Sequence, residues 1–291
     1  MSDLEQNAIE RLKAASDMSL RLFEKPLVIT YSGGKDSDVL LHLAEKSGIP
    51  FEALHSLTTA DAPETVRHVY DTFRRLEEKG VKCTVDKHVQ PDGSRVTMWN
   101  LIPRKLIPPT RLARYCCAEL KEGGGKGRFI ATGVRWAEST ARRKNRGGLE
   151  VLHSNRQKSL ILANDNEEDR RLFETCQMKG QRVVNPIIDW QDDDVLDYAA
   201  VEKIPMNPLY CKGFHRVGCV GCPMAARTRT MEFARYPKIK AAYIRAFDRM
   251  LSIRIERGME AYSWRSGVDV FHWWMEDGVL PGQEVLGGFE E

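Results

Sequence analysis

The chain has 291 residues, of which 42% are hydrophobic and 29% charged, the proportions of a soluble globular protein. Its length allows one large domain or one domain with an appendage. A net charge of +3 is too small to indicate nucleic-acid binding by itself. No apolar run is long enough to span a bilayer, and no basic segment followed by an apolar one starts the chain. We therefore expect a cytoplasmic protein with no membrane partner.

The first elements are predicted to be a helix, a strand and a second helix. Residues 3–24 distribute apolar side chains among charges, which is typical of an amphipathic packing helix. Residues 27–30 form an apolar run with strand character, and residues 39–44 have helical spacing. The stretch between them should therefore be a strand-to-helix turn.

That turn has the sequence Tyr-Ser-Gly-Gly-Lys-Asp-Ser, residues 31–37. Paired glycines let several amide N–H groups approach a bound anion, and the helix N-terminus adds partial positive charge. The turn therefore predicts a phosphate cradle, although neither the Walker A pattern nor GxGxxG is present. The alternative is a glycine turn in which Asp36 or Ser37 only caps the helix.

The hexapeptide of residues 32–37 resembles the pyrophosphate loop of the adenine nucleotide alpha-hydrolase superfamily, which includes ATP pyrophosphatases and the adenylyl-sulfate and phosphoadenylyl-sulfate reductases. The resemblance implies an α/β fold with a parallel, five-stranded-type sheet flanked by helices. It also implies a bound adenosine nucleotide, either ATP with Mg²⁺ or adenylyl sulfate or its 3′-phosphorylated form (PAPS). The residues placed around its phosphates are Ser32, Gly33, Gly34, Lys35, Asp36 and Ser37.

Further strands are predicted over residues 51–57, 81–89 and 129–135, with a helix over 64–79, so the sheet should be parallel with right-handed crossovers. Loops at the carboxyl ends of parallel strands bind ligands in such folds, which predicts nucleotide contacts from Thr59 and Asp61. Residues 63–65, Pro-Glu-Thr, resemble the end of the reductases' second signature. Asp61 and Thr65 could instead simply start a helix.

Residues 133–144 follow a predicted strand and are rich in arginine, whose forked side chain pairs with phosphate or sulfate oxygens. They resemble a superfamily segment, Gly-x-Arg-x-x-Glu-Ser-x-x-Arg. The resemblance implies nucleotide-side roles for Gly133, Arg135, Glu138, Ser139 and Arg142. Together with Lys35 and Asp36, of which Asp36 is the candidate metal ligand, Arg135 and Arg142 are the predicted catalytic residues.

Periodicity beyond Trp190 is mostly helical. We therefore expect a nucleotide-binding α/β domain over residues 1–190 and a helical C-terminal region over 191–291 that packs on it as a cap. The acidic run of residues 192–194 suits the dipole of a helix start, so structure alone explains it.

The seven cysteines are an odd number, and five lie around two short clusters, which favours metal or redox chemistry over disulfides. Cys116 and Cys117 are vicinal, and Cys219 and Cys222 form a CxxC in the C-terminal cap. Four thiolates suit zinc or an iron–sulfur cluster, but a vicinal pair is awkward for tetrahedral zinc. The alternative is reduced structural thiols or a redox pair.

The pattern of these four cysteines resembles that of the adenylyl-sulfate reductases, which implies a [4Fe-4S] cluster beside the nucleotide. Cys176 or Cys211 could replace one of the vicinal pair. The reductases also carry a nucleophilic cysteine near the C-terminus, in Glu-Cys-Gly-Leu-His. No cysteine follows Cys222 here, so ordinary sulfonucleotide reduction lacks its covalent step.

These features predict an ATP-using, iron–sulfur enzyme of sulfur transfer that adenylates an acceptor and releases pyrophosphate. The family resemblance implies a nucleic-acid acceptor, as in DNA phosphorothioation or tRNA thiolation, and a cysteine desulfurase or thioredoxin-like protein as sulfur donor. Two alternatives stay open. One is a sulfite-forming reductase that uses Cys176 or Cys211, and the other is a non-catalytic partner subunit that binds nucleotide and cluster.

Overall fold

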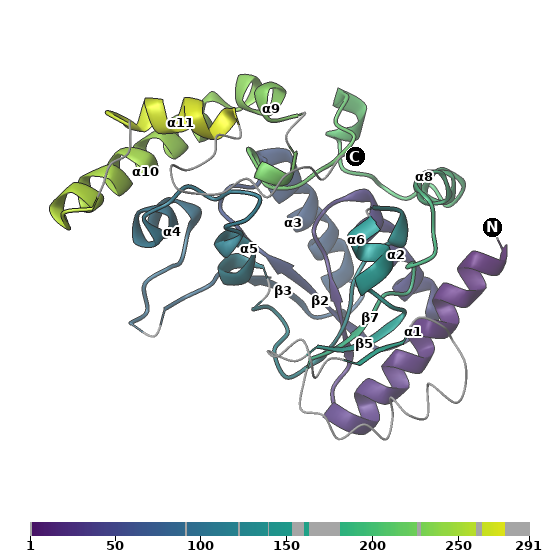
Figure 1. Cartoon of the computed structure of the whole chain (residues 1–291). Coiled ribbons are helices and arrows are strands. Elements are labelled where there is room, and N and C mark those ends of the chain that lie inside the picture. Colours follow the sequence, from purple (N-terminus) through teal and green to yellow (C-terminus); the bar gives the residue numbers. More distant parts are fainter. Residues whose placement is uncertain are drawn as a thin grey trace. The chain divides into compact units, whose positions relative to one another are not determined.

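A seven-stranded sheet organises the first of two units in the computed structural model, which describes residues 2–90, 92–121, 123–138, 140–152, 160–162, 181–225, 228–259 and 264–276. This sheet unit comprises residues 1–56, 63–86 and 123–217. The second, the helical unit, comprises residues 57–62, 87–122 and 218–291. Figure 1 labels the elements of both units, and each unit is described by itself below.

Five neighbouring strands of the sheet, starting from one edge, are parallel. They are β1 (Leu27–Thr30), β2 (Phe51–Ser56), β3 (Cys83–Asp86), β4 (Phe129–Ala131) and β7 (Gln181–Val184), in the order β3-β2-β1-β4-β7. Leu27 is in register with Phe51, and Ile29 is in register with both Ala53 and Ala131. The predicted α/β class with a parallel sheet is therefore confirmed. Two antiparallel strands that were not predicted, β5 (Leu149–Leu152) and β6 (Leu160–Leu162), extend the sheet beyond β7.

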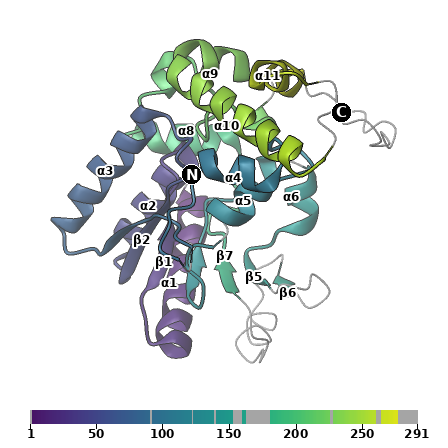
Figure 2. The same cartoon turned by 90° about the vertical axis from the view of Figure 1, so that its left-hand side faces the viewer.

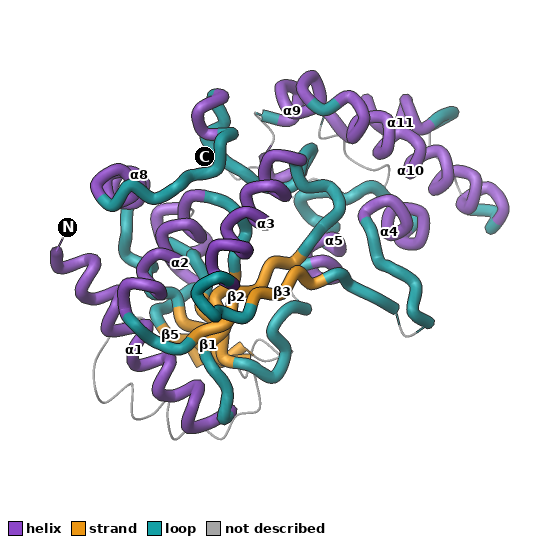
Figure 3. The backbone as a smooth tube through the Cα atoms, turned by 180° about the vertical axis from the view of Figure 1, so that it is seen from behind, coloured by secondary structure: helices purple, strands orange, loops and turns teal. Residues whose placement is uncertain are grey.

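One face of the sheet carries the main core. Strand alternation directs Leu27, Ile29, Phe129 and Val184 to this face, and Val28 with its neighbours to the other. The helices packed there are α1 (Ser2–Phe23), α2 (Lys35–Ser47), α3 (Pro63–Glu77) and α8 (Asp192–Val201), of which α1, α2 and α3 appear beside the strands in Figures 2 and 3. The sheet and these helices fix the position of the turn between β1 and α2.

The helical unit is built around the long helix α10 (Pro237–Glu256). Helices α4 (Met98–Lys105) and α11 (Gly267–Met275) pack on it, and α5 (Tyr115–Leu120) and α9 (Arg229–Arg235) belong to the same unit. Buried aromatic rings fill the space between α9, α10 and α11, and Trp274 donates its indole N–H to the carbonyl of Pro109. Within the described residues, no helix combines the length and the apolar character that a bilayer crossing requires.

Candidate functional site

The turn between β1 and α2 is shaped by one side chain, that of Ser37. Its Oγ accepts hydrogen bonds from the amides of Ser32 (3.2 Å) and Gly34 (3.1 Å) and donates to the carbonyl of Gly34 (2.8 Å). Gly33 has φ +74°, a left-handed conformation that favours glycine. The predicted strand-to-helix turn is therefore present, and α2 starts with Lys35 immediately after it.

Four charged side chains meet at the start of α2. Arg135 donates through Nε to Asp36 Oδ1 (2.6 Å) and through Nη2 to Asp192 Oδ1 (2.7 Å). Lys35 Nζ donates to the same Asp192 oxygen (2.6 Å) and to Asp36 Oδ1 (3.1 Å). The hydrogen bond from Lys35, followed by that from Arg135, outweighs burial and lowers the pKa of Asp192. The site thus holds two fixed cations, of which Arg135 is only 1% exposed.

Arg135 is brought to this position by the loop that follows β4. A Cβ on Gly133 would lie 3.1 Å from the carbonyl carbon and oxygen of Asp36, so only glycine allows this approach without a shift. Glu138 Oε1 accepts the amide of Arg135 (3.0 Å), which fixes the loop. Three of the predicted residues, Gly133, Arg135 and Glu138, therefore lie in one loop against the turn.

Ser139, another predicted residue, lies outside the described residues, and Arg142 lies in α6 (Thr140–Asn145), with its side chain outside the description.

A segment near the end of the sheet unit contacts the turn as well. Asn207 donates to the carbonyl of Gly33 (2.8 Å) and to Thr65 Oγ1 (3.2 Å), while Tyr210 Oη accepts the amide of Lys35 (2.9 Å). Thr65 was predicted only as part of the Pro-Glu-Thr resemblance or as a helix start, and no contact with the turn was predicted for Asn207 or Tyr210. An asparagine before a proline marks a turn but predicts no partner.

A buried polar network lies behind the turn. Tyr31 Oη donates to Asp38 Oδ1 (2.5 Å), and His68 Nε2 is 2.8 Å from the same oxygen. Burial, which outweighs these hydrogen bonds, raises the pKa of Asp38, and burial also raises the pKa of Tyr31.

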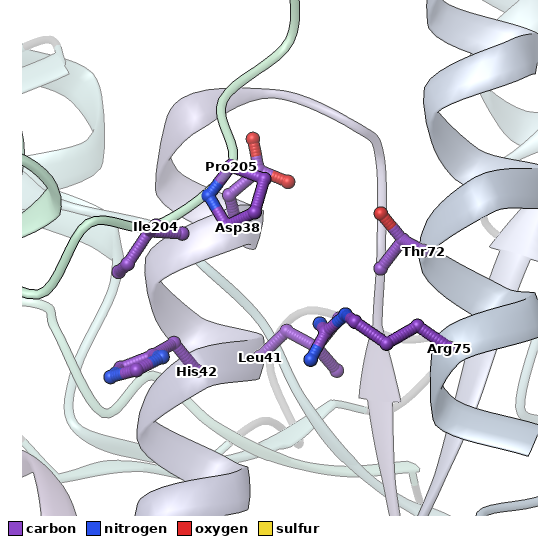
Figure 4. Close-up of a pocket in the computed structure, with 7 residues that line it drawn as sticks. All are labelled: Asp38, Leu41, His42, Thr72, Arg75, Ile204 and Pro205. Carbon is purple, nitrogen blue, oxygen red and sulfur yellow. The ribbon is translucent and has the colours of Figure 1, made fainter. Parts of the chain in front are cut away.

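A cavity of about 50 Å³ lies beside Asp38. Its other lining residues, drawn in Figure 4, are Leu41, His42, Thr72, Arg75, Ile204 and Pro205. A water molecule takes up roughly 30 Å³, so this cavity is too small for a nucleotide.

The four predicted ligand cysteines all belong to the helical unit. Cys219 pairs with Asp61 through an isolated antiparallel bridge, and its thiol lies 3.3 Å from Thr58 Oγ1. Arg114 Nη2 donates to Cys117 Sγ (3.5 Å). A hydrogen bond from Cys116, supported by Arg114, lowers the pKa of the Cys117 thiol, and the same bond raises the pKa of Cys116.

Further charges act on this set. The negative charges of Cys219 and Asp61 raise the pKa of Lys121, and Cys219 and Cys222 both add to the raised pKa of Cys116. Charges at Cys219 and Cys222 therefore act on Cys116, and burial raises the pKa of the Cys219 thiol although Lys121 lies nearby.

In the described part of the chain, no three His, Cys, Asp or Glu side chains form a group that could hold a metal ion.

The remaining predicted residues divide between the units. Cys211 is exposed in the sheet unit, in the turn η3 (Tyr210–Lys212), and Cys176 lies outside the described residues. Thr59 and Asp61, predicted as nucleotide contacts, belong to the helical unit. There Thr59 Oγ1 accepts the amide of Met98 (2.9 Å) and Asp61 accepts that of Thr58 (2.8 Å).

Comparison with solved structures finds partial similarity. The phosphoadenylyl-sulfate reductase of Candida auris matches with a TM-score of 0.42 and 16% identity, over 70% of this chain and 87% of that one. The U34-tRNA thiolase of Methanococcus maripaludis, with its [4Fe-4S] cluster, matches with a TM-score of 0.43 and 15% identity, over 88% and 80% of the two chains.

Sequence comparison is more specific. The sulfate adenylyltransferase subunit 2 of a Bradyrhizobium species is 32% identical over 219 residues, 70% of this chain and 63% of the relative. The subunit of the same name from Rhodopseudomonas palustris is 31% identical over 213 residues, 69% and 61% of the two chains. The chain thus spans less than two thirds of the length of these relatives. Residues 26–225 match the phosphoadenosine phosphosulfate reductase domain, and the chain therefore belongs to that family, as its phosphate loop predicted.

Proposed function

We propose that the protein is an ATP-using enzyme of sulfur transfer that adenylates an acceptor and releases pyrophosphate. The observation that carries the proposal is that two cations, Lys35 of the turn and the buried Arg135, both donate to Asp36 at the start of α2. Amide groups at a helix start and a forked guanidinium are the groups that bind nucleotide phosphates. The family match over residues 26–225 supports an adenine nucleotide as the ligand.

The reaction needs charge stabilisation more than covalent help from the protein. An acceptor oxygen attacks the α-phosphorus of ATP, the bond from that phosphorus to the bridging oxygen breaks, and pyrophosphate leaves with the electron pair. Lys35 and Arg135 would offset the charge that develops on the leaving group. Asp36 would hold Mg²⁺ through a carboxylate oxygen, and Arg142 stays a proposed second arginine of the site.

The sulfur chemistry is proposed for the helical unit. Cys116, Cys117, Cys219 and Cys222 would hold a [4Fe-4S] cluster, which supplies a redox-active or sulfur-binding centre when present. The donor set of four thiols beside Lys121 and Arg114 supports this assignment.

We propose two classes of acceptor. Sulfate is one, because relatives are named sulfate adenylyltransferase subunit 2. A nucleic acid is the other, because the family resemblance of the sequence implies it. The subunit name also supports a partner protein, and a cysteine desulfurase or thioredoxin-like donor is the proposed sulfur source.

Pyrophosphate release tests the proposal. Anaerobically purified protein is incubated with ATP, Mg²⁺ and either sulfate, tRNA or DNA, and pyrophosphate is measured enzymatically. We expect pyrophosphate release to depend on one of these acceptors, and its rate to fall at least tenfold in Arg135→Met. Arg74→Met is the control, because Arg74 is an exposed arginine of α3 that lies outside the arginine-rich residues 133–144. Equal rates in the two variants would refute the role of Arg135, and release from none of the acceptors would refute adenylation of them.

A reductase is the second candidate, supported by Cys211. This exposed free thiol adjoins Tyr210, which contacts the phosphate turn within the same unit. Its thiolate would attack the sulfur of adenylyl sulfate or PAPS, releasing the nucleotide and leaving an S-sulfocysteine. A thioredoxin-like dithiol would then release sulfite and become a disulfide. Sulfite formation that is lost in Cys211→Ser would support this candidate over the first.

A further inference from the structure

The groups of the turn that would bind phosphate are already paired with side chains of the protein. Asp192 Oδ1 accepts from both Lys35 Nζ (2.6 Å) and Arg135 Nη2 (2.7 Å), and Tyr210 Oη accepts the amide of Lys35 (2.9 Å). A single oxygen between an ammonium and a guanidinium, beside a helix-start amide, has the surroundings that a phosphate oxygen seeks. Asp192 and Tyr210 thus already accept hydrogen bonds from the groups that phosphate oxygens of a ligand would contact.

The side chains of Arg135 and Asp192 differ in how freely they can move. Arg135 is 1% exposed and is also bonded to Asp36 and to the carbonyl of Trp190 (3.2 Å), so it is fixed. The side chain of Asp192 is 64% exposed and lies at the first position of α8, so it can turn into solvent without disturbing the core. The carboxylate is therefore the partner that leaves when an anion arrives.

We propose that Asp192 and Tyr210 are internal competitors of the nucleotide phosphates and determine which ligands the turn accepts. This inference rests on the proposed nucleotide function. A ligand must replace both oxygens, so a di- or triphosphate chain, which offers several oxygens on adjacent phosphorus atoms, is favoured over inorganic phosphate or a nucleoside monophosphate. The acidic start of α8 then acts on ligand choice in addition to its helix dipole.

The chain offers matched controls for both residues. Asp193→Asn makes the same change of charge as Asp192→Asn, one position along the same helix start, and Asp193 is exposed. Tyr70→Phe removes an exposed hydroxyl from α3, whereas Tyr210→Phe removes the one that accepts the amide of Lys35. Any general effect of charge or of a lost hydroxyl appears equally in the control.

Isothermal titration with pyrophosphate, ATP and inorganic phosphate, each with Mg²⁺, tests the inference. The Asp192 side chain is 64% exposed, and ion pairs of an exposed carboxylate are weak, so removing it should tighten pyrophosphate binding by about two- to fivefold in Asp192→Asn relative to Asp193→Asn. Tyr210→Phe should tighten it relative to Tyr70→Phe, and the preference for pyrophosphate over phosphate should fall in both variants.

The possible results distinguish failure of the competition by Asp192 and Tyr210 from failure of the nucleotide function. Wild-type protein that binds ATP, with Asp192→Asn equal to or weaker than its control, would overturn competition by Asp192 and leave the nucleotide function standing. Tyr210→Phe that equals its control would remove Tyr210 from the pair of competitors. A wild-type protein that binds neither ATP nor pyrophosphate would overturn the proposed nucleotide function itself.

Discussion

Replacing Gly33 by alanine separates backbone strain from crowding at the phosphate turn, because Gly48 provides a matched position. Both glycines have nearly the same left-handed φ, +74° and +70°, and they lie on either side of α2. A Cβ on Gly33 would lie 3.1 Å from methyl groups of both Thr65 and Val69, whereas a Cβ on Gly48 would meet nothing within 4 Å. Only the first substitution therefore adds a steric conflict.

The magnitudes follow from these distances. A left-handed conformation costs a non-glycine residue about 1–2 kcal/mol, and an overpacked contact costs about 1–3 kcal/mol more. We expect Gly48→Ala to lower the free energy of unfolding by about 1–2 kcal/mol and Gly33→Ala by about 2–5 kcal/mol, measured by urea unfolding of the full chain followed by circular dichroism. Gly33→Ala should also lose ATP binding, which Gly48→Ala should retain. Equal losses of stability would refute crowding by α3 as the reason for glycine.

Two further predictions concern charge and metal. Burial alone would raise the pKa of Glu45, but hydrogen bonds from Lys79 (2.6 Å) and Arg75 (3.0 Å) hold it below its usual value. The ionised Glu45 therefore stabilises the fold above about pH 4.5, and this stabilisation is lost as the pH falls through the lowered pKa. We expect Glu45→Gln to lower the free energy of unfolding by up to about 1 kcal/mol at pH 7 and to leave it unchanged in acid. Thermal melts at the two pH values measure the difference. Cys219→Ser should abolish iron and sulfide after anaerobic reconstitution while Cys211→Ser keeps them; iron retained in Cys219→Ser would contradict the proposed ligand set.

The sheet and the turn were predictable because their signals are local. Strands 27–30 and 129–131 are short, mainly apolar runs, and strand 51–56 has buried residues at alternate positions. The order of strands and helices along the chain implies parallel pairing. The turn is encoded in six consecutive residues, so its conformation depends little on distant parts of the chain. Arg135 and Gly133 were found because their motif directly follows a strand.

Asp192 and Tyr210 were not predicted as site residues because they reach the turn only through folding, from positions far along the chain. Lys35 and Asp192 are 157 positions apart, and Lys35 and Tyr210 are 175 apart. An acid at a helix start has a sufficient local explanation in the helix dipole, so the sequence offered no reason to look further. The strands β5 and β6 were missed for a similar reason, since they form only by pairing with β7 and with each other.

The buried network of Tyr31, Asp38 and His68 shows that residues on either side of the phosphate turn also help to fix its conformation. Tyr31 directly precedes the turn and Asp38 directly follows it. Tyr31 donates a hydrogen bond to Asp38 Oδ1, and His68 of α3 contacts the same oxygen. Replacing buried polar or ionic groups by apolar ones is often neutral or stabilising, so stability alone does not account for such a set. Its effect is geometric: the hydrogen bond from Tyr31 to Asp38 closes the two ends of the turn, and the contact with His68 ties them to α3. Ser37 fixes the turn from within and this network fixes it from behind, so its amides keep one conformation.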